Sequence, residues 1–404
     1  MHISQRQLFF QNIAQTSDTP LALEIERAEG LYLIDNDGKQ YLDLISGIGV
    51  SNIGHRHPEV LKAIHEQLNK HMHLLVYGEF VQGSQTQLAA ALAETLNKTT
   101  ASQAPYGPID HIYFTNSGTE AVEGAMKLAK RFTGRSEFIS CTNAYHGATQ
   151  GALSLSGAEY FKSNFRPLLP GISQISHGVE SDLDQITQKT AAVIIEIVGG
   201  ESGIRLASSG YFQALRSRCT QTGTLLVLDE IQTGFGRTGT FWAFEDYNIY
   251  PDILLSAKAM GGGMPIGAFM APQTIMQVLK NNPVLGHITT FGGHPVSCAA
   301  SLAALQVTIH DDLAKKAIAK GALFKSLLVH ERIKEVRGKG LMLAVQMESF
   351  DILKTTIDRC IERGLITDWF LFCDDAMRLA PPLTIQDHEI REACSTICQV
   401  LDTL

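Results

Sequence analysis

Two apolar runs of the chain end in charged residues of opposite sign. Residues 224–230 (TLLVLDE) carry Asp229 near their end, and residues 252–258 (DILLSAK) end in Lys258, which three glycines follow after two further residues. Continuous apolar runs predict strands covered on both faces, and ligands bind beyond the carboxyl ends of such parallel strands. There Asp229 and Lys258 form either a partly buried ion pair or a reactive pair facing one cleft. The two runs alone leave both interpretations open.

A candidate anion site lies upstream, in the segment TNSGTEAVEGAMKLAK. A strand, a Ser-Gly-Thr turn and a helix follow one another, and this order offers backbone N–H groups and the positive helix end to an anion. Gly118 permits close approach, and Ser117 and Thr119 add hydroxyl groups. In the alternative interpretation, Ser117 or Thr119 only caps the helix, and Glu120 or Glu123 completes a capping box.

One cofactor requires all three parts, the anion site, the lysine and the aspartate. Pyridoxal 5'-phosphate (PLP) carries a phosphate, an aldehyde that forms a Schiff base with a lysine, and a ring nitrogen that an aspartate keeps protonated. An ionised Asp229 beside that nitrogen would favour its protonated form, which withdraws electrons from a substrate carbanion. The combination therefore predicts a PLP enzyme with Lys258 as its covalent anchor.

Segments along essentially the whole chain resemble blocks of the class III, or omega-type, aminotransferases, which are fold-type I PLP enzymes. The most specific is the block LVLDEIQTGFGRTGTFWAFEDYNIYPDILLSAKAMGGGMPIGA, which links Asp229 to Lys258. The others occur in family order: GIGVSNIGHRHPEV, FTNSGTEAVEGAMKLA, NAYHGAT, EIVGGESG, TTFGGHPVSCAA and MRLAPPLTI. The resemblance implies an aminotransferase of the acetylornithine, ornithine or 4-aminobutyrate type.

The resemblance also implies cofactor-binding roles for individual residues. Lys258 would be the Schiff-base lysine, and its freed amine would carry the proton between substrate and cofactor carbons. Asp229 would pair with the ring nitrogen, and Gln232 would hydrogen-bond the ring phenolate oxygen. Tyr145 of AYHG would stack on the ring; otherwise it is an ordinary core tyrosine. Ser117–Thr119 would hold the phosphate.

Three further residues are implied at the substrate end and at a subunit interface. Arg378 would bind a substrate carboxylate bidentately, a task suited to a guanidinium group. Glu201 resembles the glutamate that, in the ornithine and 4-aminobutyrate branches, pairs with that arginine when no α-carboxylate needs it. Thr290 would reach the phosphate bound in the other subunit, which implies a homodimer with shared active sites.

One departure from the family pattern bears on the substrate. The acetylornithine, ornithine and 4-aminobutyrate branches typically read HGRT, whereas this chain reads HGAT, with Ala148 in place of the arginine. That arginine helps to bind a carboxylate, and alanine supplies no charge. Either the substrate lacks this carboxylate, or another cation, Arg205 or Arg166, compensates. The block EIVGGESG also carries Ile197 and Gly200 where the family often has Pro and Gln.

The order of apolar runs and amphipathic stretches predicts an α/β fold with a mostly parallel sheet and helices on both faces. The resemblance implies a sheet of the seven-stranded type in a PLP-binding large domain over residues 51–300. A smaller α+β domain would combine an N-terminal segment, residues 1–50, with residues 301–404. Within it we expect a hairpin over residues 30–47 and a strand across residues 377–385 (MRLAPPLTI).

Composition limits the classes of partner. The chain has 404 residues and a net charge of −8, which argues against nucleic acid or an anionic membrane surface as a partner. No apolar stretch is long enough for a membrane span, and the seven cysteines form no C-x-x-C pair, so we expect a cytoplasmic protein. His55, His57, His71 and His73 suggest a metal site by composition, but GHRHPEV matches a family block, and we expect no metal.

The leading hypothesis is a transaminase that moves an amino group from a primary terminal amine to a 2-oxo acid such as 2-oxoglutarate. Acetylornithine or ornithine is the first choice of donor, and 4-aminobutyrate or another omega-amine is the alternative. An aminomutase of the glutamate-semialdehyde type, which needs no external acceptor, is a second enzyme class on the same scaffold. A catalytically silent PLP-fold protein is disfavoured by the complete set of Lys258, Asp229 and Gln232.

Overall fold

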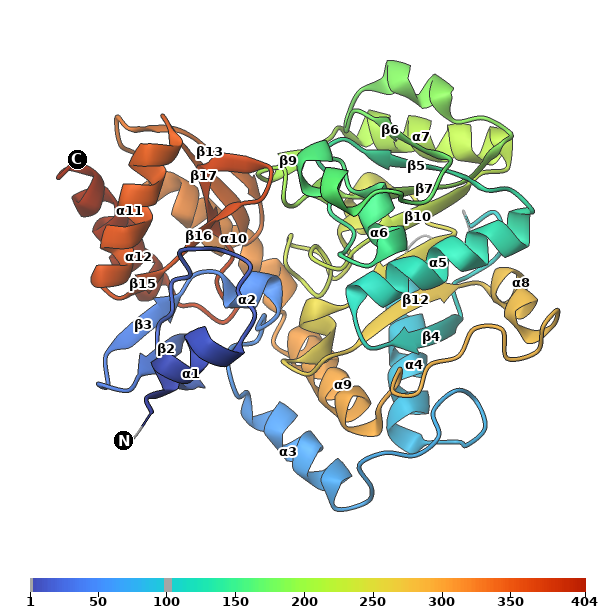
Figure 1. The fold of residues 1–404 in the computed structure, drawn as a ribbon, viewed down its shortest axis with the longest axis horizontal. Helices are drawn as coiled ribbons and strands as arrows, with labels where there is room; N and C mark the ends of the chain where they lie inside the picture. The colour runs from blue at the N-terminus through green and yellow to red at the C-terminus, as the bar shows by residue number, and fades with distance from the viewer. Residues whose placement is uncertain (1–2, 98–103) are drawn as a thin grey trace.

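The computed structural model describes residues 3–97 and 104–404 and has two parts side by side (Figure 1). The larger part is built on a seven-stranded sheet with the spatial order β4-β12-β11-β10-β7-β5-β6. Its strands are β4 (His111–Thr115), β5 (Glu137–Cys141), β6 (Ile172–Ile175), β7 (Thr190–Glu196), β10 (Leu225–Asp229), β11 (Ile253–Ser256) and β12 (Gly267–Ala271). Only β12 runs antiparallel to its neighbours in this sheet, so the sheet is mostly parallel.

Helices cover both faces of this sheet, and the burial of β7 shows why its residues 191–195 are all apolar. Val193 and Ile195 belong to one buried cluster, which includes residues of α4, α7 and α9. Ala192 and Ile194 belong to another, which includes residues of α5 and α6. The helices of this part are α3 (Pro58–Leu68), α4 (Gly83–Leu96), α5 (Gly118–Thr133), α6 (Gln150–Leu155), α7 (Ser209–Thr222), α8 (Gln273–Met276) and α9 (Pro295–His310). No described helix has both the length and the apolar character that crossing a membrane requires.

The smaller part contains two four-stranded sheets, with the orders β1-β2-β3-β15 and β13-β14-β17-β16. Their strands are β1 (Ile25–Glu29), β2 (Tyr32–Asp35), β3 (Gln40–Asp43), β13 (Ile333–Lys339), β14 (Met342–Met347), β15 (Leu365–Ile366), β16 (Asp368–Phe370) and β17 (Cys373–Leu379). The accompanying helices are α1 (Gln5–Asn12), α2 (Ser46–Gly49), α10 (Leu313–Leu327), α11 (Phe350–Glu362) and α12 (Asp387–Leu401). β15 pairs in parallel with β3, Leu365 opposite Leu42, so segments from both ends of the chain share one sheet.

Short elements connect these layers. A two-stranded ribbon of β8 (Val198–Gly199) and β9 (Arg205–Leu206) lies between the two parts in Figure 1. The 3-10 helices are Glu159–Phe161, Ser163–Phe165, Glu180–Gln185, Ala243–Tyr247, Lys258–Gly261 and Gln277–Lys280.

The hairpin predicted over residues 30–47 is present as the antiparallel pair β2 and β3. The strand predicted over residues 377–385 is partly wrong, because β17 ends at Leu379. Pro381 and Pro382 follow, and proline has no N–H group to donate to a sheet. The domain boundaries near residues 50 and 300 stay a prediction.

Candidate active site

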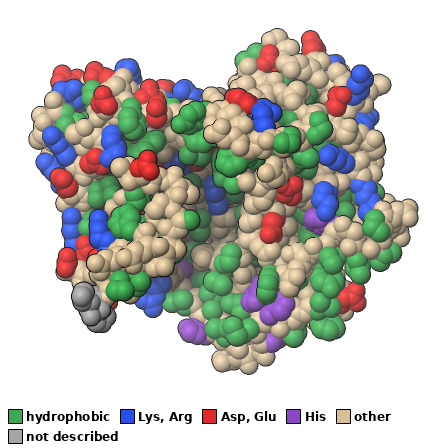
Figure 2. All heavy atoms as spheres, in the orientation of Figure 1, with side chains coloured by type: hydrophobic (Ala, Val, Ile, Leu, Met, Phe, Trp, Pro, Cys, Tyr) green, Lys and Arg blue, Asp and Glu red, His purple; other side chains and the backbone are tan. Residues whose placement is uncertain are grey.

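A cavity of about 500 Å³ opens at the carboxyl ends of β10 and β11, and Figure 2 shows the surface hollowed between the two parts of the molecule. Most of the predicted site residues line this cavity: Ser117, Gly118, Thr119, Tyr145, Glu201, Asp229, Gln232 and Lys258. Arg378 reaches the cavity wall through Glu201, to which it is bonded. Thr290 is exposed and is not among the described residues that line the cavity.

Lys258 begins the 3-10 helix that follows β11, with a backbone φ of 46°. A non-glycine residue in this region is uncommon and is a reason to look for function. Burial lowers the pKa of the Lys258 amine, and the nearby Glu201 carboxylate opposes this effect. The glycine run behind the lysine packs on α9: a Cβ on Gly262 would lie 3.0 Å from Cβ of Ala304 and 3.2 Å from the Ala300 carbonyl oxygen.

Asp229 lies at the last position of β10 and forms a buried pair with His146. His146 Nδ1 is 2.7 Å from Asp229 Oδ2, and the other carboxylate oxygen accepts the Ile231 N–H at 3.0 Å. Burial alone would lower the pKa of His146, but the hydrogen bond and charge of Asp229 outweigh it and raise the pKa. The remaining ring nitrogen, Nε2, is buried and has no hydrogen-bond partner within residues 3–97 and 104–404. His146 therefore holds the Asp229 carboxylate in place through this hydrogen bond.

Sequence reasoning missed His146 and a second buried carboxylate, Glu196. Glu196 lines the cavity, and burial raises its pKa to about 7. Its register partner in the sheet is Asp229, because β7 and β10 are parallel neighbours. A signal for His146 was available, since it directly follows Tyr145 in AYHG, but its pairing with a strand 83 positions away depends on the tertiary fold.

The Ser-Gly-Thr turn begins α5 beside the cavity. Ser117 Oγ accepts the Glu120 N–H at 3.3 Å, so Ser117 caps α5. The predicted capping box is not formed, because Glu120 accepts from Asn116 and Glu123 accepts from Thr149. The first N–H groups of a helix have no intrahelical partner, and those of α5 lie where Gly118 and Thr119 line the cavity. Gly118 is tightly packed, because a Cβ there would lie 2.9 Å from Ile231 Cδ1. The turn therefore combines a cap with donors and a positive helix end that suit an anion.

Gly200 explains one departure from the family pattern. A Cβ at this position would overlap the Gln232 side-chain oxygen, so the absence of a side chain makes room for the amide on the cavity wall. The Gly200 N–H donates to Glu196 Oε1 at 3.1 Å. Tyr145, on the same wall, is 38% exposed, which rules out a fully buried core position.

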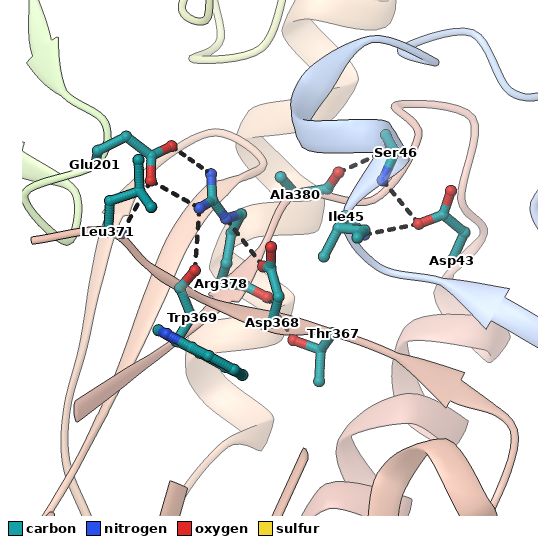
Figure 3. Close-up of polar contacts among 10 residues, drawn as sticks. All are labelled: Asp43, Ile45, Ser46, Glu201, Thr367, Asp368, Trp369, Leu371, Arg378 and Ala380. Atoms are coloured by element: carbon teal, nitrogen blue, oxygen red, sulfur yellow. Dashed lines mark hydrogen bonds and ion pairs between the residues drawn. The ribbon is translucent and has the colours of Figure 1, made fainter. Parts of the chain in front are cut away.

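Arg378 lies on β17 and is bonded to two carboxylates (Figure 3). Its Nη1 and Nη2 donate to the two oxygens of Glu201 at 2.8 and 2.9 Å, and Nε donates to Asp368 Oδ1 at 3.0 Å. Nη2 also donates to the Trp369 carbonyl at 3.1 Å, and the guanidinium carbon lies 4.6 Å from the centre of the Phe370 ring. Asp368 was not predicted from the sequence. It is a second carboxylate beside Arg378, so two acidic side chains contact this one cation.

The position of the missing family arginine is open to the cavity. Ala148 is exposed and lines the cavity wall. Neither candidate replacement is there: Arg166 forms a two-pronged exposed pair with Glu159, and Arg205 projects from the exposed strand β9. Lys258 is the only Lys or Arg among the described residues that line the cavity. No described cation therefore takes the place of the arginine.

Three of the four histidines of the N-terminal blocks have other partners, and the buried His71 Nε2 has none among the described residues. His55 Nε2 is 2.8 Å from Asp43 Oδ2, His57 caps α3, and the His73 ring stacks on that of His294. Within the described residues, no group of three or more His, Cys, Asp or Glu side chains is placed to hold a metal ion.

Comparison with known proteins bears directly on the family. The class-III aminotransferase family model matches residues 13–401. The acetylornithine aminotransferase of Methanopyrus kandleri is 37% identical over 378 residues, which cover 92% of both chains. The putrescine aminotransferase of Pectobacterium atrosepticum is 38% identical over 383 residues, covering 90% of this chain and 78% of the relative.

A solved structure of the ornithine aminotransferase of Toxoplasma gondii, described with PLP at its active site, superposes with a TM-score of 0.90 at 29% identity. The match covers 99% of this chain and 95% of that one. The predicted fold class and cofactor are thereby confirmed. The chain belongs to the class III aminotransferases, and it is a PLP-dependent enzyme of fold type I that transfers an amino group between an amine donor and a 2-oxo acid.

Proposed function

We propose that the cavity at the ends of β10 and β11 is the PLP site of this aminotransferase. The observation that carries the proposal is that Lys258, Asp229 and the N-terminus of α5 line one cavity of about 500 Å³, a size typical of cofactor sites. The fit is chemical as well: an amine, a braced carboxylate and an anion-binding helix end face the same space. Bound PLP supplies an electron-withdrawing ring that stabilises negative charge on a substrate carbon.

In this proposal each residue acts on one part of the reaction. The lowered pKa of Lys258 favours its neutral amine, which can bond the cofactor aldehyde and then accept and return a proton through Nζ. Asp229, held by His146, would pair with the ring nitrogen and favour its protonated form. Gln232 would hydrogen-bond the ring oxygen, and Tyr145 would cover the ring. Arg378 receives the acceptor's carboxylate when Glu201 moves away.

The donor we propose is a primary terminal amine. Acetylornithine or ornithine comes first because relatives that carry those names match over most of the chain. A 4-aminobutyrate-type or other omega-amine is the alternative, and 2-oxoglutarate is the expected acceptor. Turnover that needs no external 2-oxo acid would instead identify an aminomutase.

We also propose that the enzyme is a cytoplasmic homodimer with shared sites. Thr290 is exposed away from its own cavity, which fits a contact with the partner's phosphate. Large apolar side chains are exposed on the two segments around it: Met72, Phe80, Val81, Val284, Leu285, Ile288 and Phe291. Figure 2 shows hydrophobic and histidine side chains along the lower edge, where Figure 1 has the loop between α3 and α4. Light scattering of the purified protein tests this proposal, and a monomer at micromolar concentration would contradict it.

The PLP site is tested by absorbance. Purified wild type should be yellow, and Lys258→Ala should lose the lysine-dependent visible band and at least about 10⁴-fold of the turnover rate, because covalent catalysis and proton transfer are both removed. Lys130→Ala, a lysine of α5 that does not line the cavity, is the matched control and should keep the band. A wild type that stays colourless with added PLP would overturn the assignment.

A further inference from the structure

The charge around Arg378 does not balance. One guanidinium, 4% exposed, is bonded to Glu201, 7% exposed, and to Asp368, 30% exposed. Glu201 alone already occupies both Nη groups with a bidentate pair. Asp368 takes the remaining Nε, so the cluster of three side chains carries one more negative than positive charge whenever both acids are ionised.

Asp368 is firmly placed by the sheet. It begins β16 and is the register partner of Arg378 on β17, so the two side chains leave neighbouring strands together. Burial raises the pKa of Asp368 to about 6, against the opposing charge of Arg378. Burial would also raise the pKa of Glu201, but the hydrogen bonds and charge of Arg378 lower it. Both carboxylates are therefore largely ionised at neutral pH.

Apart from the reacting Lys258, no described Lys or Arg that lines the cavity offsets the excess. Ala148 stands where the related branches have arginine, and no described cation replaces it. A donor whose terminal amine reacted beside Lys258 would direct its other end into the rest of the cavity. Glu201, which lines the cavity, brings the negative cluster to that space.

We propose that Asp368 is a specificity-determining residue, whose carboxylate leaves this end of the cavity with excess negative charge and selects donors with a second ammonium group, such as aliphatic diamines, over donors that end in a carboxylate. This inference rests on the proposed function of the same cavity. A carboxylate at the far end meets like charge, which disfavours the wrong ligand more than it improves the right one. A far-end ammonium group is instead attracted by the excess negative charge.

The arrangement still lets a 2-oxo acid bind in the second half of the reaction. Asp368 holds Nε, whereas Glu201 holds the two Nη groups that face the cavity wall. When Glu201 moves away, the Nη edge becomes free for a bidentate carboxylate while Nε stays anchored. Asp368 therefore orients the arginine and at the same time weakens its pull on carboxylates.

The test compares donors of matched length on the holoenzyme. Putrescine and 4-aminobutyrate share a four-carbon chain and one reacting amine, and differ only in a far-end ammonium or carboxylate. Single-turnover conversion of the PLP form to the pyridoxamine form, without acceptor, gives the rate constant for each. We expect putrescine to react at least about tenfold more efficiently, because juxtaposed like charges are strongly unfavourable. Ornithine should likewise exceed acetylornithine, whose α-amine is acylated.

The decisive variant is Asp368→Asn, which keeps an oxygen acceptor for Arg378 Nε but removes the charge. It should reduce the putrescine to 4-aminobutyrate ratio about tenfold and bind glutarate, an unreactive dicarboxylate, more tightly in calorimetry. Asp374→Asn removes an equal charge from an exposed position of β17 and should leave both values unchanged. Asp368→Glu should preserve the preference for putrescine.

Four results separate the possible failures. A wild type that reacts faster with 4-aminobutyrate, or an Asp368→Asn protein that is folded by circular dichroism and has an unchanged ratio and glutarate affinity, would overturn the role of Asp368. If both donors slow equally in Asp368→Asn, the residue is only structural and the proposal is wrong. A wild type with no half-reaction on any amine would instead refute the proposed function.

Discussion

The two halves of the site are held in different ways. Asp229 ends β10, Lys258 follows the adjacent parallel strand β11 of the same buried sheet, and α5 begins beside them. Arg378 and Asp368 come from the smaller part of the molecule, and Glu201 comes from the ribbon region of the larger part. The cofactor half is thus built within one layer, whereas the substrate half is an ion cluster that joins two parts.

This difference explains why residues of the substrate half can be substituted more easily than residues of the cofactor half. The ends of buried parallel strands are fixed by the packing of both faces, so residues there keep their positions when loops change. An ion cluster between two parts depends on a few side chains, and one substitution changes its net charge without disturbing a core. At the substrate half, Ala148 stands where the related branches typically have arginine, and Asp368 adds a second carboxylate beside Arg378.

The largest effect is expected when the Asp229 carboxylate is removed from the cofactor half. Asp229→Ala should lower kcat by at least about 10²–10³, the loss seen when a group that stabilises reaction charge is deleted from a closed site. Steady-state kinetics at saturating donor and acceptor measures this loss. Glu137→Gln removes an equal charge from the exposed first position of β5, outside the cavity, and should change kcat little. Equal losses in both variants would contradict a special role for Asp229.

Removing the Arg378 side chain from the substrate half should weaken acceptor binding and protein stability more than it weakens the binding of PLP. Arg378→Ala leaves the buried Glu201 and the half-buried Asp368 without their cation, which should cost about 3–5 kcal/mol of unfolding free energy. The efficiency with 2-oxoglutarate should fall about 100-fold, because the bidentate contact is lost. Denaturant melts, acceptor kinetics and PLP absorbance are measured on one preparation. If PLP binding weakened as much as acceptor turnover, the division into two halves would be wrong.

A smaller effect should follow from restoring the family arginine. Ala148 is exposed on the cavity wall, so Ala148→Arg has room for its side chain. The added cation should raise kcat/KM for 4-aminobutyrate about tenfold and lower it for putrescine, by attraction of the far-end carboxylate and repulsion of the ammonium. Ala148→Gln has similar bulk without charge and serves as the control. An equal gain from glutamine would assign the effect to packing.

The smallest expected effect is a change of donor preference with pH. Because burial raises the pKa of Asp368 to about 6, its charge is present above that pH and is lost as the pH falls through it. Glu201, whose pKa is lowered beside Arg378, keeps its charge over the same range. The putrescine to 4-aminobutyrate ratio should therefore fall several-fold between pH 8 and pH 5.5, as favourable charge is neutralised. In Asp368→Asn the fall should be much smaller, with the remainder due to Glu196, whose pKa of about 7 lies in the same range. An undiminished fall there would exclude Asp368 as the titrating group.

Much of the cofactor half could be predicted from the sequence, because strand ends can be located where continuous apolar runs stop. Asp229 and Lys258 are such positions, and the Ser117 turn is marked by a strand followed by a helix. The partner of Asp229 could not be predicted, since His146 lies in a loop whose approach depends on tertiary folding. Asp368 was missed because its importance comes from the register between β16 and β17, which no local pattern in the sequence encodes.

The parallel pairing of β15 with β3 sets an order on how the enzyme can be completed during synthesis. Leu42 is made early, but its neighbour Leu365 emerges only after most of the chain has been translated. Along the chain, β12 is the last strand of the seven-stranded sheet. This sheet can therefore assemble while the C-terminal strands of the smaller part have not yet left the ribosome. Arg378 follows β15 along the chain, so a nascent protein would hold the complete set of PLP-site residues of one subunit before it could recognise a substrate carboxylate.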